Sequence, residues 1–315
     1  MNDCCGFLAN IRKWLTDKEG CEIIYMESAK LILGCGLHPI TKSFINIMCI
    51  FMCITSGGKT RNGSSDTGKI EWGYAPENGP DVWAELSPKY MLCAVGKHQS
   101  PINLVNPTSA NLPPIPYYYD NPTRMDIRNT GHTIEVVYPE GNWIEIDGVR
   151  YQLLQFHFHA PSEHTVAGKL FEMEVHFVHK SEEGNLAVVG VLIEKGSHNF
   201  AFDPVWAHLP STPGETQRVE NVTEDGSLIV NPRFMFSPND QVEDISPSYF
   251  GSSYRYEGSL TTPPCSEDVK WIVLTTPIEM SEAQIAAFKA IIHDNNRPVQ
   301  PLNGRELLVD VEANE

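Results

Sequence analysis

The sequence has few basic residues for its length, and this shortage limits the partners that the protein can bind. It contains 23 Lys and Arg against 40 Asp and Glu in 315 residues, which gives a formal net charge of −17 and a pI of about 5.0. A surface with this charge repels nucleic acid phosphates and anionic membranes. We therefore expect no nucleic acid partner, although simple solubility also explains such a charge.

An apolar run near the N-terminus is too short for a typical transmembrane helix. Residues 43–55 (SFINIMCIFMCIT) carry no charge and precede the small residues 56–58. Their length fits the hydrophobic region of a signal peptide, whereas a membrane-spanning helix needs about 20 apolar residues. About forty residues come before the run, so either the true start lies further along or the run is an uncleaved membrane anchor. A buried core helix is the remaining alternative.

Cysteine is scarce beyond the N-terminal region. Only two of the eight cysteines, Cys93 and Cys265, lie after residue 53. An isolated pair in a large domain indicates either one disulfide or two unrelated buried thiols, and sequence spacing does not decide between them.

The composition divides the chain into three parts. Residues 59–69 (KTRNGSSDTGK) are polar and rich in Gly, Ser and Thr, which is typical of a flexible linker. We therefore expect an N-terminal extension over residues 1–58, a linker over 59–70 and one folded domain over 71–315. No second linker, internal repeat or low-complexity tract interrupts that domain.

Short alternating apolar runs dominate the folded domain, and turn residues separate them. The runs predict strands over residues 133–138, 143–146, 151–159, 171–179, 186–194 and 269–275. Helices are expected over 203–209 and over 281–295, the second with Ser281 as its N-cap. The sequence thus predicts a predominantly β single domain, with a large central, mostly antiparallel twisted β-sheet and a few short peripheral helices.

Three histidines on two predicted strands form a candidate metal site. Alternate residues of a strand share one face, so His157 and His159 project together from residues 155–159 (QFHFH). A His-x-His pair alone is a weak signal, but His176, in residues 172–178 (EMEVHFV), completes three nitrogen ligands if the strands are neighbours. Three protein ligands with one open position are typical of catalytic zinc, and no nearby cysteine offers a fourth.

Each metal-bound histidine needs a hydrogen-bond partner on its other ring nitrogen. Gln155 lies two residues before His157, and Glu174 lies two residues before His176, each on the same strand face as its histidine. Burying a carboxylate is costly without such a role, which favours Glu174 as a partner. The alternative is that Glu174 is a solvated charge on the strand face.

Several motifs in order along the chain resemble the alpha carbonic anhydrases. Residues 155–159 and 172–176 (EMEVH) are similar to the three-ligand signature of that family, and residues 161–166 (PSEHTV) are similar to the segment between them. Further motifs that resemble the family are 72–74 (WGY), 78–80 (NGP), 99–103 (QSPIN), 258–265 (GSLTTPPC), 271–274 (WIVL) and 296–302 (NRPVQPL). The resemblance covers residues 71 to about 307, and several ordered motifs are far more specific than one.

The resemblance implies a role for each residue of the candidate site. His157, His159 and His176 correspond to the family's zinc ligands, so Zn²⁺ is the implied cofactor. Thr261 matches the threonine that orients zinc-bound hydroxide, and Glu163 matches the glutamate that holds the proton of that threonine. A turn threonine and a loop-surface carboxylate are the alternatives for these two residues.

The resemblance also implies a route for protons. His132 matches the family's proton shuttle, a role that a histidine can fill because it titrates near neutrality. Tyr74 matches a tyrosine that helps to order the water chain. An exposed turn histidine is the alternative for His132. Glu135 departs from the family, which usually carries a neutral polar residue there, so the resemblance does not imply the rate or the pH profile.

Six further residues correspond to the family's substrate cavity. Thr262 follows Thr261 directly, and the apolar wall that receives carbon dioxide corresponds to Val178, Val188, Leu260, Val269 and Trp271. Packing in an ordinary core also explains valine and tryptophan at such positions.

Cys93 and Cys265 coincide with the pair that is bridged in secreted and bacterial members of the family. A bridge would brace the loop that bears Thr261, and together with the apolar N-terminal run it indicates an oxidising compartment. We therefore expect a secreted or periplasmic protein, a monomer or a dimer, which is membrane-anchored only if residues 43–55 are retained.

The expected function is the zinc-dependent, reversible hydration of carbon dioxide to bicarbonate and a proton. A non-catalytic carbonic-anhydrase-like binding module is the first alternative, but such modules typically lose a zinc histidine and all three are present here. A zinc hydrolase of another fold is the second, and it often carries a His-Glu-x-x-His helix, which the sequence does not contain.

Overall fold

The computed structural model describes residues 14–16, 22–24, 71–119, 124–219, 232–236 and 250–310. The chain divides into two compact units, residues 1–64 and 65–315. In the first unit, β1 (Trp14–Thr16) and β2 (Glu22–Ile24) pair in antiparallel fashion. The apolar run 43–55 and the expected linker 59–70 lie outside the described residues. Among the helices that are described, none combines the length and the apolar character needed to span a bilayer.

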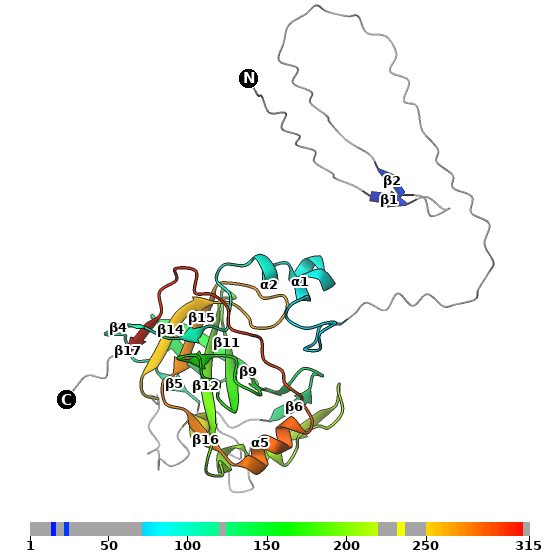
Figure 1. The fold of residues 1–315 in the computed structure, drawn as a ribbon. Coiled ribbons are helices and arrows are strands. Elements are labelled where there is room, and N and C mark those ends of the chain that lie inside the picture. Colours follow the sequence, from blue (N-terminus) through cyan, green and yellow to red (C-terminus); the bar gives the residue numbers. More distant parts are fainter. Residues whose placement is uncertain are drawn as a thin grey trace, which may run out of the picture. The chain divides into compact units, whose positions relative to one another are not determined.

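A sheet of 13 strands forms the centre of the second unit (Figure 1). Its main path contains, in order of pairing, β13 (Thr216–Val219), β6 (Met125–Asn129), β7 (Ile134–Val137), β9 (Val149–His159), β11 (Met173–Ser181), β12 (Leu186–Lys195), β15 (Val269–Leu274), β14 (Ser253–Gly258), β17 (Leu308–Asp310) and β4 (Thr108–Ala110). Three strands lie off this path: β16 (Ile278–Met280) beside β12, β8 (Trp143–Ile146) beside β9, and β5 (Tyr117–Tyr118) beside β8. A separate parallel pair joins β3 (Asn103–Leu104) to β10 (Thr165–Val166).

The predicted fold class is confirmed. Most neighbouring strands of the large sheet are antiparallel, and the parallel pairs are β12 with β15, β12 with β16, and β17 with β4. All six predicted strands are present; the one over 143–146 has the predicted bounds, and the ends of the other five agree to within two residues. Strand ends are set by hydrogen bonding to neighbours, which the alternation of apolar residues does not report.

The helices of the described part are short. They are α1 (Trp83–Leu86), η1 (Pro88–Tyr90), α2 (Leu92–Val95), η2 (Phe200–Phe202), α3 (Asp203–Trp206), α4 (Pro232–Phe236) and α5 (Glu282–Lys289). Figure 1 shows α1 and α2 at one end of the domain and α5 at the opposite end. Ser281 caps α5 through a capping box with Gln284, as its position predicted. The expected helix over 281–295 is too long, because its last residues instead enter the site described below.

The central strands are buried on both faces. On β11, Val175 and Phe177 pack in the larger hydrophobic cluster, whereas Val178 packs in a smaller cluster on the other face. The smaller cluster also contains Val188 and Trp271. His176, an even-numbered residue, therefore projects to the same side as the smaller cluster.

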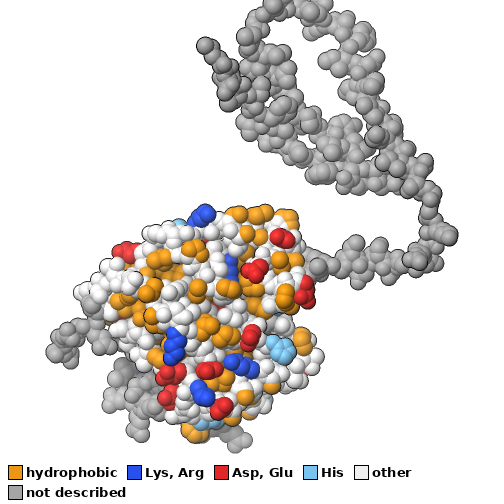
Figure 2. Space-filling model, viewed as in Figure 1, with side chains coloured by type: hydrophobic (Ala, Val, Ile, Leu, Met, Phe, Trp, Pro, Cys, Tyr) orange, Lys and Arg blue, Asp and Glu red, His pale blue; other side chains and the backbone are white. Residues whose placement is uncertain are grey.

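The visible surface carries both signs of charge. Figure 2 shows acidic and basic side chains interspersed with hydrophobic ones on one face of the domain. Despite the net charge of −17, this face is thus not uniformly acidic.

Candidate metal centre

Strands β9 and β11 bring three histidines together. In the antiparallel register of these strands, His176 lies opposite His157 and Glu174 lies opposite His159. One nitrogen from each of the three imidazoles lies within 4.8 Å of the other two. The side chains therefore form a cup in which a single ion can contact all three rings.

One nitrogen of each imidazole already has a hydrogen-bond acceptor. The three contacts join His157 Nδ1 to Gln155 Oε1 at 2.9 Å, His176 Nε2 to Glu174 Oε1 at 2.8 Å, and His159 Nδ1 to the main-chain oxygen of Asn295 at 2.8 Å. Since each partner atom is an acceptor, each of these ring nitrogens carries the hydrogen, and the other nitrogen keeps its lone pair. The Nε2 atom of His159 is buried without a hydrogen-bond partner, which is an acceptor that a cation would satisfy.

Burial keeps these imidazoles neutral. It lowers the pKa of all three, to about 4 in His159, and the neighbouring histidines lower the pKa of His157 further. The Glu174 carboxylate opposes burial at His176, although the pKa of His176 still lies below its usual value. Neutral imidazole is the form that binds metals. Three such donors fit Zn²⁺ with one position left open.

Glu174 is buried and held by several donors. Its side chain is 0% exposed, so it is not a solvated charge on the strand face. Oε2 accepts hydrogen bonds from the main-chain N–H groups of Glu163 and His164 at 2.9 and 2.8 Å, and Oε1 lies 2.7 Å from His164 Nδ1. Burial raises the pKa of Glu174, but His164 and His176 outweigh burial and hold it well below its usual value. The partner of His176 is therefore a fixed carboxylate.

Gly190 on β12 makes room for this carboxylate. It lies opposite His176 in the register of β11 and β12. A Cβ atom at this position would lie 3.0 Å from Glu174 Oε1 and 3.4 Å from a methyl group of Val273. A larger residue would therefore push the carboxylate away from His176.

Glu163 and Thr261 lie beside the cup. Glu163 is 0% exposed and Thr261 is 5% exposed. The main-chain N–H of Arg297 donates to Glu163 Oε1 at 2.8 Å, and the Thr261 side chain lies near enough to the same carboxyl group to lower its pKa. Burial raises the pKa of Glu163 to about 7, against the lowering effects of His176, Thr261 and Arg297. Glu163 Oε2 lies 3.9 Å from His176 Nδ1, so this pair borders the open side of that imidazole.

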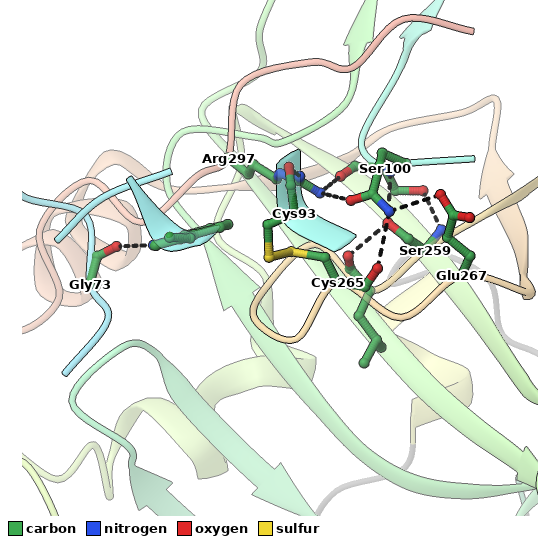
Figure 3. Close-up of a disulfide and its surroundings, with 10 residues drawn as sticks. Gly73, Cys93, Ser100, Ser259, Cys265, Glu267 and Arg297 are labelled. Atoms are coloured by element: carbon green, nitrogen blue, oxygen red, sulfur yellow. Dashed lines mark hydrogen bonds between the residues drawn. A yellow bond between two sulfur atoms is a disulfide. The ribbon is translucent and has the colours of Figure 1, made fainter. Parts of the chain in front are cut away.

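A disulfide fixes the loop that carries Thr261. It joins Cys93, in α2, to Cys265, with 5.1 Å between their Cα atoms. Figure 3 shows the Arg297 guanidinium beside Cys93 and Ser100, where it donates to their main-chain oxygens at 2.8 Å each. The Gln99 side chain donates to the main-chain oxygen of Cys265 at 3.0 Å. The loop is thus tied to the N-terminal part of the domain both covalently and through buried polar contacts.

The predicted substrate-cavity residues share one region. Four of them are buried in the smaller hydrophobic cluster, namely Val178, Val188, Val269 and Trp271. Leu260 packs against this cluster and is only partly buried, as is Thr262. The cluster lies on the face of the sheet that carries His176, so the apolar side chains border the metal cup.

His132 and Tyr74 lie beside an aromatic group near the domain's N-terminus. The His132 ring stacks on Trp72 with 3.7 Å between ring centroids, and Tyr74 meets Trp72 edge-on. Burial lowers the pKa of His132, while the Glu71 carboxylate raises it. Burial also raises the pKa of Tyr74 well above its usual value, with a smaller rise from Glu163 and a lowering by Arg297.

Glu135, the departure from the family pattern, lies on β7 directly opposite His157. Burial raises its pKa, and Arg128 opposes this rise with its guanidinium 3.9 Å from the carboxylate. The carboxylate therefore stands on a strand that adjoins one of the three histidines.

Sequence reasoning missed several residues that hold the site together. His164 and Arg297 lie in motifs that were recognised, at 161–166 and 296–302, but neither had an assigned role. Asn295 accepts from His159 through a main-chain oxygen, which every residue has, so its side chain gave no signal. Gly190 contributes by having no side chain, and an isolated glycine in a strand indicates only a close approach.

Comparison with known proteins gives one consistent family. The family model described as eukaryotic-type carbonic anhydrase matches residues 78–311. A carbonic anhydrase of Neisseria gonorrhoeae is 41% identical over 239 residues, covering 75% of this chain and 87% of that protein. A Nostoc carbonic anhydrase is 38% identical over 260 residues, covering 80% and 88%. The solved alpha-carbonic anhydrase of Thermovibrio ammonificans, in complex with the inhibitor sulfanilamide, matches with a TM-score of 0.67 and 41% identity over 76% of this chain and 100% of that chain.

Proposed function

The chain belongs to the eukaryotic-type, or alpha, carbonic anhydrase family, and on this basis we propose that it catalyses the zinc-dependent, reversible hydration of carbon dioxide to bicarbonate and a proton. One observation carries the proposal: His157, His159 and His176 converge within 4.8 Å, and each has one ring nitrogen engaged and one free. Among the described residues, no fourth metal-binding side chain joins this trio. An open fourth position distinguishes a catalytic zinc site from a structural one.

His157, His159 and His176 would hold zinc, which would supply Lewis acidity that lowers the pKa of water toward neutrality. The chain's own contribution begins with the orientation of the three imidazoles. Gln155, Glu174 and the Asn295 carbonyl hold each ring in the neutral tautomer that can donate a lone pair.

Thr261 and Glu163 orient the attacking oxygen. The Thr261 hydroxyl donates its hydrogen to the buried Glu163 carboxylate, so its oxygen is left to accept a hydrogen bond from the reacting water. The Arg297 main-chain N–H fixes the carboxylate in turn. This chain of contacts allows one orientation of the water in which a lone pair points toward the substrate.

The apolar cluster receives carbon dioxide, which is small and nonpolar. Its wall consists of side chains that are mainly apolar, namely Val178, Val188, Leu260, Val269 and Trp271. The bicarbonate product is charged, and binding against this surface would cost it part of its hydration. Thr262 offers the product one hydroxyl beside this wall. His132 then carries the released proton toward the solvent, and Tyr74 helps to order the water through which it travels.

The test uses the full-length chain. We expect one zinc per chain, hydration activity that a chelator abolishes and zinc restores, and inhibition by a sulfonamide. Thr261→Val should keep the zinc but lower the rate by about 100-fold, because the hydroxyl that orients the reacting water is missing. Thr216→Val, on the exposed face of β13, is the matched control and should change neither. Stoichiometric zinc without hydration by the unaltered chain would contradict catalysis and favour the binding-module alternative.

The location and organisation of the chain are also proposals. The Cys93–Cys265 disulfide supports an oxidising compartment, so we propose a secreted or periplasmic protein, monomeric or dimeric. We propose that residues 1–58 form an extension with a signal or anchor segment at 43–55, that 59–70 are a linker, and that 71–315 are the catalytic domain. The intact mass of the mature protein, measured before and after reduction, tests the cleavage and the bridge together.

A further inference from the structure

We propose that His293 is a second proton carrier, which takes protons from His132 and releases them to buffer in the solvent. This inference rests on the function proposed above and extends its proton route by one residue. Nothing in the sequence motifs singled out His293. The structure places it on the lining of a cavity that His132 also lines and that none of the three metal-cup histidines lines.

The cavity has a volume of about 660 Å³. Both histidines line it, together with Tyr74 and residues on the chain that follows α5, including Ile292 and Asn295. None of the three metal-cup histidines lines it, and neither does Thr261 or Glu163. At roughly 30 Å³ for each water, the space has room for about 20 waters between the residues that line it, which include both histidines.

The two histidines are held near each other by Asn295. Its side-chain amide donates to the main-chain oxygen of His132 at 2.9 Å, and its own main-chain oxygen accepts from the ligand His159. His293 precedes Asn295 by two residues, which is a reach of at most about 7 Å along the chain. The same short segment thus connects the metal centre, the first proton carrier and the second.

Exposure sets the direction of transfer. His132 is half-buried and its ring is covered on one side by Trp72, whereas His293 is exposed. An imidazole takes up and releases protons near neutral pH. A proton that reaches His132 therefore gains access to external buffer when it moves on to His293.

The transfer conserves protons and changes no other bond. Protonated His132 gives one proton to the water in the cavity and becomes neutral. His293 accepts one proton from that water at its free ring nitrogen, becomes an imidazolium and then gives one proton to a buffer base. Both imidazoles and the water end as they began.

Few charges surround this path. Within the cavity they are Lys289 and Asp294, beside the two histidines themselves. The Lys289 ammonium is 3.7 Å from Glu172, and the Glu71 carboxylate acts on His132 from the N-terminal side. Residues of both signs thus border the cavity, so no single sign of charge dominates its lining.

The first test compares two histidine replacements in the full-length, zinc-loaded protein. His293→Gln removes the proton carrier but keeps a polar side chain, and His98→Gln, at an exposed histidine outside the cavity, is the matched control. We expect His293→Gln to lower kcat about two- to fivefold at low buffer concentration and to leave kcat/KM for carbon dioxide unchanged, because only the proton exit is affected. Added imidazole should restore kcat, and the control should match the unaltered chain.

The second test does not depend on activity. NMR titration of the imidazole rings should show that His293→Gln raises the pKa of His132, because the substitution removes a group that carries positive charge from the cavity that both residues line. An unchanged kcat at low buffer or an unchanged His132 titration would overturn the proposal. If the unaltered chain binds zinc but shows no hydration, the proposed function fails and this proposal fails with it; if that chain is active, only the second carrier is at stake.

Discussion

His176 and His179 are three residues apart on β11, but they face opposite sides of the sheet. Both are buried, with exposures of 1% and 0%. His176 faces Glu174 and two further imidazoles, whereas the Nε2 atom of His179 lies 2.5 Å from the hydroxyl of Tyr119, a member of the larger hydrophobic cluster. Burial lowers the pKa of both rings, and that of His179 falls to about 3.

The difference between these two regions shows what distinguishes a histidine of the proposed zinc site from a buried histidine that serves packing. Burial and neutrality are common to both sides of the sheet. Only the His176 side adds a carboxylate that orients the ring and other imidazoles whose free nitrogens converge. On the His179 side the hydrogen-bond partner is the Tyr119 phenol, whose ring also stacks on the imidazole, so the same residue type serves packing.

The largest contrast should come from replacing each histidine in turn. His176→Ala removes one of three ligands, so zinc affinity should fall by more than the roughly 100-fold that the loss of an outer hydrogen-bond partner can cost, and hydration should be lost. His179→Phe fills its site with another ring and should keep zinc and activity. Metal content after dialysis against buffered zinc, with a hydration assay, checks both. Zinc retention by His176→Ala would remove the basis of the comparison.

A smaller effect is expected when the carboxylate beside His176 is altered. Glu174→Gln removes the charge, and Gly190→Ala crowds it, so each should weaken zinc binding by about 10- to 100-fold while the three ligands remain. Competition with a zinc chelator of known affinity measures the change. Glu182→Gln makes the same change of charge at an exposed glutamate and should leave the affinity unaltered.

His179 should make the stability of the protein depend on pH in the acidic range. Its pKa is about 3 in the fold and about 6.5 in an unfolded chain, so below pH 6.5 only the unfolded chain takes up this proton. The free energy of unfolding therefore falls as the pH decreases toward 3, by up to about 1.4 kcal/mol per pH unit, and is unaffected above 6.5. Urea unfolding measures this. Between pH 7 and pH 5, the free energy of unfolding should fall by about 2 kcal/mol more in the unaltered chain than in His179→Phe. Equal losses would show that His179 is not the titrating group.

The smallest effect should come from the partner of His179. Tyr119→Phe leaves one buried polar atom without its hydrogen bond, which should cost about 1–3 kcal/mol of stability. Zinc content and hydration should not change, because Tyr119 lies on the other face of the sheet from the metal cup. Thermal unfolding at neutral pH measures the cost, and a loss of zinc would show that the two faces are coupled.

The sequence predicted the parts of the site that depend on local spacing. His157, His159, Gln155 and Glu174 follow from the two-residue period of a strand, which needs no knowledge of distant segments. The meeting of His176 with the first pair required β9 and β11 to be neighbours, a long-range fact that only the resemblance to a family could supply in advance.

Contacts between segments that are distant in the chain could not be predicted from the sequence. The bond from His159 to the Asn295 carbonyl spans 136 residues, and no side-chain pattern encodes it. The helix predicted over 281–295 was too long for a related reason. Apolar periodicity continues through Ile291 and Ile292, but the chain leaves the helix after Lys289 and delivers Asn295 to the site. The four-residue helices α1 and α2 are too short to show any period.

The position of the cup within the sheet bears on how the proposed zinc site would take up its ion. β9 is bonded to β7, β8 and β11, and β11 is bonded to β9 and β12, so neither strand offers a loose edge at the ligands. The loss of conformational entropy that comes with fixing the three rings therefore occurs when the chain folds, not when the ion binds. Removal of the ion by a chelator should therefore lower the free energy of unfolding only by the amount that ion binding contributes. The three rings should keep their positions and be able to bind the ion again.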